Sequence, residues 1–417
     1  MAAVQTRPPN SVRLPSITTL RRAIPQHCFA PSTARSLLYL SRDVMSCICL
    51  GILALQIPLI ESFTARIAAW VVYGILQGAV CTGLWIFGHE CGHGAFSRSR
   101  WISDTVGWLV HSSLLVPYFS WRSSHARHHR YSGHITKDTA FVPYRDHELE
   151  ARRASKWTWW LFEDTPIAVM LLLVAQQILG WPLYFLFYAS AGSDTLQRKV
   201  ERKWWRISHY DPTSLIYQPR EAKAVLLSDM GLVIALTTLY RWATKSGTSM
   251  VVLIYGIPYL WVNHWMVTIT YLQHTHPSVP RYEHGTWTFT QGALCTVDRD
   301  TGILGRYFFH RVMETHVVHH FFPKIPFYYA DEATQAIIPL LGHHYHYETA
   351  PLMPTDEQRI RHSNRIPKLD EFIITWTADW GILPTVGIVG GYCGWVIIKN
   401  AKKKANVHNA KIYWMYL

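Results

Sequence analysis

IAAWVVYGILQGAVCTGLWIFGHECGH, residues 67–93, joins an uncharged run of 22 residues to the cluster His89-Glu-Cys-Gly-His93. A helix that spans a bilayer needs about 20 predominantly apolar residues, so this run is long enough to cross a membrane. On a helix, positions i and i+4 lie on one face, which places the two imidazoles on successive turns. The stretch therefore predicts a membrane helix that ends in a pair of metal ligands.

Two further clusters follow the pattern H-x-x-H-H, namely His125-Ala-Arg-His128-His129 and His316-Val-Val-His319-His320. With 23 histidines in 417 residues, H-x-x-x-H is expected roughly once by chance and H-x-x-H-H only roughly 0.07 times. In such a triplet the adjacent pair diverges by about 100° around the helix axis, so one triplet can contact two metals. The repeated pattern is therefore the stronger signal.

Together the three clusters supply eight imidazoles. Imidazole binds iron, copper, nickel and zinc, so the ligand type alone does not select the metal. A structural zinc ion takes four ligands, fewer than this chain offers. The count favours two metal ions in a membrane-embedded site, and two irons fit it best.

Composition places the chain among membrane proteins. It is 49% hydrophobic, and uncharged runs occur at 44–60, 67–88, 105–121, 166–192 and 249–272. A sixth apolar stretch, 224–243, carries only Asp229 and Arg241. The net charge of +13 would also suit a nucleic-acid partner, but membrane proteins gather Lys and Arg in cytosolic loops. The prediction is an all-α polytopic membrane protein with no nucleic-acid partner.

Histidine clusters that share one site must lie on the same side of the membrane, and this requirement limits the topology. Run 44–60 crosses and run 67–88 returns, which delivers His89 at a cytosolic helix end. Run 105–121 separates the first two clusters, so it cannot cross once. It has 17 residues and contains Pro117, which indicates a re-entrant or interfacial path.

Three apolar runs separate the second and third clusters, so one of them has to stay on the cytosolic side. Segment 193–223 holds seven Lys and Arg residues, whereas 241–248 holds two. The segment with seven should be cytosolic, and run 166–192 is therefore predicted not to cross. Four transmembrane helices result, near 44–60, 67–88, 224–243 and 249–272, with both termini and a histidine-box di-iron domain in the cytosol.

Longer strings around these clusters resemble the microsomal fatty acid desaturases of the oleate (Δ12) type, most closely the fungal ones. The resemblance covers about residues 20–350. The strings are His89-Glu-Cys-Gly-His-Gly-Ala-Phe-Ser97, His111-Ser-Ser-Leu-Leu-Val-Pro-Tyr-Phe-Ser-Trp121, Ile269-Thr-Tyr-Leu-Gln-His-Thr-His-Pro277, Gly292-Ala-Leu-Cys-Thr-Val-Asp-Arg-Asp300, His316-Val-Val-His-His320 and Ala330-Asp-Glu-Ala-Thr334.

The resemblance implies a di-iron oxidoreductase on the cytosolic face of the endoplasmic reticulum membrane. Such an enzyme uses O2 and electrons from cytochrome b5 and its reductase to desaturate the acyl chain of a lipid such as a phospholipid. The chain lacks the His-Pro-Gly-Gly haem motif of fused cytochrome b5 domains, so the donor should be a separate protein. A dimer with a second copy, or with another desaturase, is compatible with this assignment.

The resemblance also implies the metal ligands. By match with the histidine boxes of the family, the ligands are His89, His93, His125, His128, His129, His316, His319 and His320. A ninth imidazole follows the last span in related membrane desaturases; here His274 is the first candidate and His276 the second.

Ligand histidines usually hand their second N–H to a carboxylate or carbonyl. Asp298, Asp300 and Glu314 lie near the third cluster and are candidates for this supporting role. The alternative for these three carboxylates is ordinary ion pairing at the surface.

By this resemblance the expected reaction inserts a cis double bond at Δ12 of an oleoyl chain to give linoleoyl. The chain departs from the family pattern at Tyr131-Ser132-Gly133-His134 and at Asp138-Thr-Ala-Phe-Val-Pro143. Because small pocket changes redirect the same oxidant, a hydroxylase, acetylenase or conjugase remains the alternative. A histidine-rich metal transporter would need ionisable residues along the spans, where only Asp229, Arg241 and His264 occur.

The ends of the chain complete the predicted domain organisation. Residues 1–43 form a basic arm whose first 42 residues hold six Arg and no acid. This composition also fits a transit peptide, but residues 20–29 share the family sequence, so we interpret the arm as cytosolic. The desaturase domain is predicted at 44–378 and an atypical C-terminal tail at 379–417.

Overall fold

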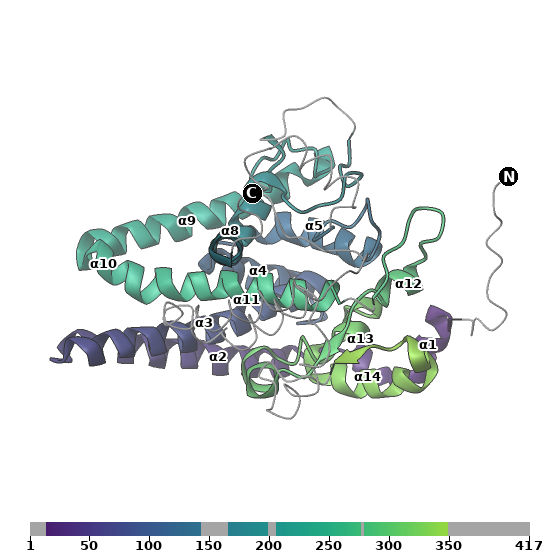
Figure 1. Ribbon diagram of the computed structural model, residues 1–417, viewed down its shortest axis with the longest axis horizontal. Helices are drawn as coiled ribbons and strands as arrows, with labels where there is room; N and C mark the ends of the chain where they lie inside the picture. Colours follow the sequence, from purple (N-terminus) through teal and green to yellow (C-terminus); the bar gives the residue numbers. More distant parts are fainter. Residues whose placement is uncertain (1–13, 143–165, 199–205, 277–278, 349–417) are drawn as a thin grey trace.

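The computed structural model describes residues 14–142, 166–198, 206–276 and 279–348, and these residues are mostly helical (Figure 1). The predicted all-α class is confirmed. The α-helices are α1 (Ile17–Ala23), α2 (Thr33–Ala54), α3 (Phe63–His93), α4 (Arg100–Ser113), α5 (Tyr118–Tyr131), α8 (Pro166–Phe187), α9 (Ala222–Ser246), α10 (Thr248–Val251), α11 (Ile257–His274), α12 (Phe289–Ala293), α13 (His316–Phe321) and α14 (Phe327–Leu341).

Short helical turns and one pair of strands join these helices. The turns are η1 (Gln26–Phe29), η2 (Ile57–Leu59), η4 (Pro219–Glu221), η5 (Val252–Gly256), η6 (Leu304–Phe308) and η7 (Gly342–His344). Strands β1 (Asp298–Arg299) and β2 (Tyr347–Glu348) pair in parallel, with Asp298 opposite Tyr347.

The ends of α3 show why the sequence folds this way locally. Ser62 caps its N-terminus by accepting a hydrogen bond from the Ala65 backbone N–H, as N-cap serines do. The last helical residue is His93, and Gly94 follows with φ of 74°. That left-handed conformation suits glycine, so the helix stops directly after the second imidazole of its cluster.

Five helices are long and apolar enough to cross a membrane: Thr33–Leu59, Phe63–His93, Met170–Phe187, Pro219–Ser246 and Thr248–His274. The four predicted spans coincide with four of them, and the fifth is α8. Helix α2 begins at Thr33, so the boundary of the N-terminal arm predicted at residue 43 lies inside this helix. The predicted tail at 379–417 lies outside the described residues.

Helix α8 has a different direction from the other long helices. Figure 1 shows α8 nearly along its own axis, whereas α2, α3, α9 and α11 extend across the picture. Its contacts show that it packs across α11 and α3. Gln177 accepts a hydrogen bond from Thr268, and Trp181 packs edge-to-face on Trp85 of α3, with ring centroids 5.7 Å apart.

The run 105–121 forms two short helices rather than one continuous re-entrant path. Helix α4 ends at Ser113, and Leu115 takes a left-handed φ of 57°. Pro117 then precedes α5. With 14 residues, α4 is too short to span a bilayer. It packs against α3 and α9 and leaves Trp101 76% exposed, which fits the interfacial alternative.

Helices α3 and α11 approach closely through small residues. A Cβ built on Gly78 would lie 2.2 Å from the Cβ of Trp261 and 3.4 Å from the Pro258 carbonyl oxygen. This contact holds together the two helices that end in His93 and His274.

Gly78→Ala should therefore destabilise the protein. Overpacking a close contact costs about 1–3 kcal/mol, and the expected result is a lower unfolding temperature in detergent. Gly51→Ala is the matched control, because nothing lies within 4 Å of a Cβ at that position of α2. Equal unfolding temperatures for the two variants would contradict the close approach.

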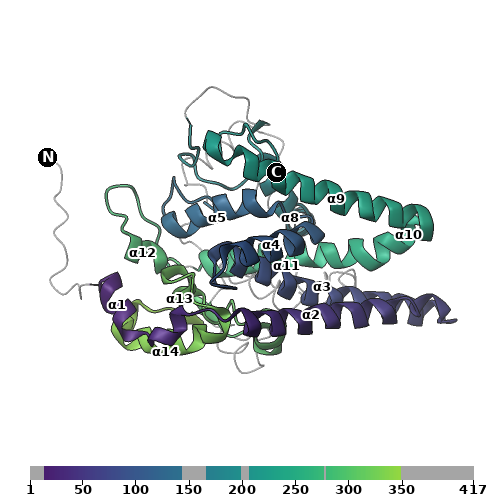
Figure 2. The same cartoon turned by 180° about the vertical axis from the view of Figure 1, so that it is seen from behind.

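A second core supports the third histidine cluster. It joins Leu20 and Cys28, which precede α2, to Val317 and Val318 of α13 and to Ile337 of α14. Figures 1 and 2 both show α1 beside α14 at the same end of the molecule. Segments far apart in sequence therefore pack against α13, the short helix that carries His316, His319 and His320.

Candidate metal centre

Four helices bring nine imidazoles together. The first cluster ends α3, the second lies on α5, the third lies on α13, and His274 is the last residue of α11. The prediction that every cluster lies on a helix is confirmed. All nine imidazoles lie at the ends of long apolar helices or on short helices packed against them.

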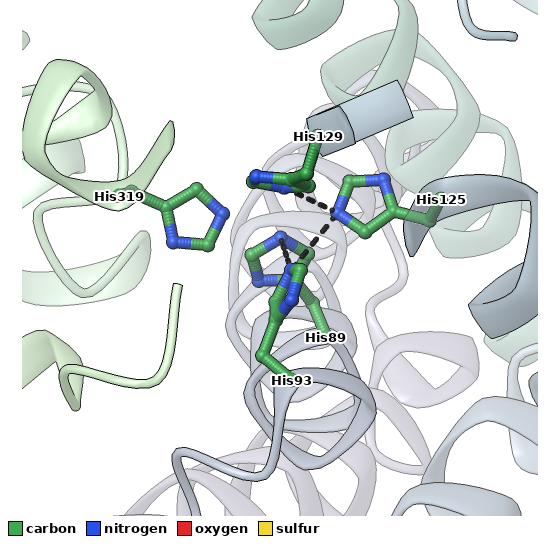
Figure 3. A group of neighbouring side chains, drawn as sticks. All are labelled: His89, His93, His125, His129 and His319. Atoms are coloured by element: carbon green, nitrogen blue, oxygen red, sulfur yellow. Dashed lines mark hydrogen bonds between the residues drawn. The ribbon is translucent and has the colours of Figure 1, made fainter. Parts of the chain in front are cut away.

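Five imidazoles form one group, which Figure 3 shows. Its members, His89, His93, His125, His129 and His319, each offer a ring nitrogen within 4.8 Å of the others. The Nε2 atoms of His93 and His89 are 3.2 Å apart. His319 faces the other four from α13, with its ring centroid 4.6 Å from that of His89.

The remaining four imidazoles form a second group beside the first. His128, His274 and His320 offer nitrogens within 4.8 Å of one another. His316 joins them, because its Nε2 lies 3.2 Å from Nε2 of His274 and 3.2 Å from Nε2 of His320.

Helix geometry explains how the triplets are divided. His128 and His129 are adjacent on α5 and point about 100° apart, and they belong to different groups. His319 and His320 divide in the same way on α13. Each H-x-x-H-H cluster therefore contributes to both groups, as the spacing of the pattern predicts.

His274 and His276 have different surroundings. His274 is 5% exposed and its ring lies 4.7 Å from that of His128. His276 instead places Nε2 3.3 Å from Oε2 of Glu348. Helix α11 ends between them, so of the two candidates for a ninth ligand only His274 lies in a group.

Burial favours the neutral form of five of these imidazoles. Loss of solvent and, to a smaller extent, neighbouring imidazoles lower the pKa of His316 to about 3. The pKa values of His125, His129, His319 and His320 are also well below the usual value, for the same two reasons. Neutral imidazole is the form that ligates metals, and converging nitrogen lone pairs call for a cation between them. The two groups therefore fit two transition-metal ions.

A carboxylate that the sequence analysis did not select supports the second group. Nδ1 of His128 donates to Oδ1 of Asp138 at 2.7 Å, which leaves Nε2 free to bind a metal. Asp138 is 1% exposed and also accepts hydrogen bonds from the Gly133 and Ala140 backbone N–H groups. Burial opposes its charge, but His128, Arg281 and these amides hold its pKa below the usual value. Its only sequence signal is an acid directly before the uncharged string Thr139–Val142.

The three carboxylates selected from the sequence have other partners in the described structure. Asp298 accepts hydrogen bonds from the Val317 N–H at the start of α13 and from the Tyr345 hydroxyl. Burial raises the pKa of Asp298 to about 7. Glu314 accepts from Thr301, and Asp300 pairs with Arg306.

Tryptophans cover the imidazoles on the side of the apolar helices. Trp121 stacks on His125 with ring centroids 4.4 Å apart, and Trp85 stacks on His89 at 5.7 Å. Both indoles are buried, at 2% and 8% exposure. This arrangement excludes water from that side and suits an apolar reactant.

Comparison with known proteins identifies the family. The model of the family described as "Fatty acid desaturase" matches residues 66–351, which include all three histidine clusters and His274. The chain belongs to the fatty acid desaturase family.

Several relatives are similar over most of their length. The chain is 43% identical to an oleate hydroxylase of Claviceps purpurea, over 80% of this chain and 73% of the relative. It is 41% identical to a Delta(12) fatty acid desaturase of Mortierella alpina, over 81% and 84%. A Delta(12)-fatty-acid desaturase of Arabidopsis thaliana is 42% identical, over 81% and 83%.

Proposed function

We propose that this desaturase inserts a cis double bond at Δ12 of an oleoyl chain carried on a membrane lipid, giving linoleoyl. The observation that carries the proposal is the pair of imidazole groups, one of five and one of four histidines, at the ends of apolar helices. Tryptophan side chains stack on histidines of the five-imidazole group. Family members of about 41% identity that carry the Delta(12) desaturase name support the position of the double bond.

The metal is proposed to be two irons, one held by each imidazole group. With O2 and electrons from a separate cytochrome b5 and its reductase, two irons supply the oxidising power to remove hydrogen from an unactivated C–H bond. An all-imidazole donor set suits iron. Membership of the fatty acid desaturase family supports these cofactors and partners.

The residues of the chain itself position the reactants. The imidazoles of each group turn ring nitrogens toward one another, and Asp138 fixes the tautomer of His128. Trp85 and Trp121 present flat apolar surfaces next to His89 and His125. Regiochemistry then depends on how far an acyl chain reaches past these rings, since small displacements of a reacting carbon have large effects on rate.

A hydroxylase is the second candidate. The relative of 43% identity from Claviceps purpurea is named an oleate hydroxylase, and one of 42% identity from Ricinus communis is named an oleoyl-12-hydroxylase. The same two imidazole groups would serve both reactions, so the ligand set does not separate them.

Fatty acid analysis tests the reaction directly. We would express the chain in a yeast that makes oleate but no linoleate, and locate double bonds by mass spectrometry. The expected product is linoleate. A hydroxylated product would replace the desaturase by the hydroxylase, and no product from abundant, iron-loaded protein would reject both.

We further propose four membrane crossings, by α2, α3, α9 and α11, with the site in the cytosol at the endoplasmic reticulum. Helices α3 and α11 end in the imidazole groups, and α9 begins beside α5, where Ser123 donates to Glu221. Helix α8 packs at an angle to these four helices. We propose that it does not cross the membrane and stays on the side of the bilayer that holds the imidazole groups.

Glycosylation mapping tests this topology. Acceptor sequons placed at Gly247, between α9 and α10, and at Glu61, between α2 and α3, should be glycosylated in microsomes. A sequon at Asp194, after α8, should stay unmodified. Glycosylation at Asp194 would show that α8 crosses the membrane.

A further inference from the structure

Arg281 lies between two segments that carry members of the four-imidazole group. Its side chain is 14% exposed. The backbone beside it is fixed, because the Tyr282 N–H donates to the Gly133 carbonyl at 2.9 Å and the Ile135 N–H donates to the Tyr282 carbonyl at 3.2 Å. The loop after α11 therefore runs alongside the loop after α5 and holds the guanidinium in place.

The first contact of Arg281 is with the end of α11. Its Nη2 donates to the backbone carbonyl of His274 at 3.0 Å. The last carbonyls of a helix have no partner within the helix, and a cation there is favoured by the helix dipole. The guanidinium thus caps α11 at the residue whose imidazole enters the group.

The second contact is with the carboxylate that orients His128. Nη1 of Arg281 lies 3.7 Å from Oδ2 of Asp138, while Oδ1 accepts the hydrogen bond from His128. A buried carboxylate needs charged or hydrogen-bonding partners to remain ionised. Arg281 is such a partner, and its guanidinium also lies over the Phe141 ring, 5.7 Å from the centroid.

We propose that Arg281 is the positioning residue of the four-imidazole group. One guanidinium holds His274 through its backbone carbonyl and His128 through Asp138, although the two imidazoles come from helices more than 140 residues apart in the chain. Among the described contacts of Arg281, none involves the five-imidazole group. The inference rests on the proposed two-metal function and adds that the two metal sites have separate supports.

Iron binding tests the proposal in the full-length protein purified in detergent. Wild type should hold two irons per chain, measured by mass spectrometry of the metal. Arg281→Met should hold about one iron, and an Fe²⁺ titration should show one of two binding steps weakened about 10–100-fold, the usual effect of losing an outer-shell partner. The iron affinity of Arg281→Lys at that step should be intermediate, because an ammonium keeps the positive charge but not the planar set of N–H donors of a guanidinium.

Arg299 provides a matched control. It is 6% exposed, and its Nε donates to the Leu272 carbonyl at 3.1 Å, in the same last turn of α11. The described contacts of Arg299 do not include Asp138. Arg299→Met should lower the unfolding temperature but keep both irons. Loss of one iron in Arg299→Met as well would overturn the specific role of Arg281.

The other outcomes are also decisive. Two irons at wild-type affinity in Arg281→Met would overturn the proposal, as would equal weakening of both binding steps. If Arg281→Met is not monodisperse, the iron titration of Arg281→Lys tests the proposal instead. Wild-type iron affinity in the lysine variant would show that the guanidinium geometry has no role. A wild-type protein without iron would instead reject the proposed two-iron function.

Discussion

His274→Ala is expected to lower linoleate formation by more than about a hundredfold, whereas His276→Ala should keep most of it. Loss of an outer-shell partner alone costs about 10–100-fold in related metal sites, so loss of a ligand should cost more. The imidazole of His274 lies 3.2 Å from that of His316 and is buried. His276 pairs with Glu348 outside both groups.

The pair of variants is its own control, since one removes an imidazole at the end of α11 and the other removes an imidazole two residues later. Product would be measured by fatty acid analysis at matched protein levels, and iron per chain in the purified proteins. Iron should fall in His274→Ala and stay at two in His276→Ala. The opposite pattern would make His276 the ninth ligand, and full activity in both would place that ligand elsewhere.

Asp138→Asn is expected to reduce turnover about 10–100-fold with little change in the amount of folded protein. The amide has no negative charge to stabilise the N–H of His128, so the imidazole can rotate or change tautomer. Because the pKa of Asp138 is held below its usual value, the native carboxylate stays charged at neutral pH. Its contribution to stability is lost only as the pH falls below about 4.

Asp300→Asn is the comparison for this substitution. Asp300 is one of the three carboxylates that the sequence suggested, but it pairs with the exposed Arg306. Its variant should desaturate at the wild-type rate. Wild-type turnover in Asp138→Asn would show that the 2.7 Å hydrogen bond does not orient the ligand.

Local sequence determined the helices and the histidine clusters. In the described residues, five of the six apolar runs lie in long helices, because backbone groups in an apolar environment must bond internally. The H-x-x-H-H spacing divided each triplet between two groups because a helix turns about 100° per residue. Helix α2 begins at Thr33, inside the stretch 1–43 that the sequence indicates as a basic arm, so residues 33–43 continue the helix.

Other features depended on contacts that no local pattern records. Run 105–121 breaks into α4 and α5 because Leu115 and Pro117 turn the chain; Pro117 indicated a re-entrant or interfacial path, but not where the two helices end and begin. Asp138 could not be selected over Asp298, Asp300 and Glu314, because distance along the chain to a histidine does not predict which carboxylate meets an imidazole in space.

The sequence by itself therefore determined the class of protein, the positions of the main helices and eight of the imidazoles, since these follow from hydropathy and helical period. Only the tertiary structure decided that His274 enters a group and His276 does not, that α8 crosses the other long helices, and that Asp138 and Arg281 support one group. These features arise where helices distant in sequence meet, and the packing between them sets which side chains touch.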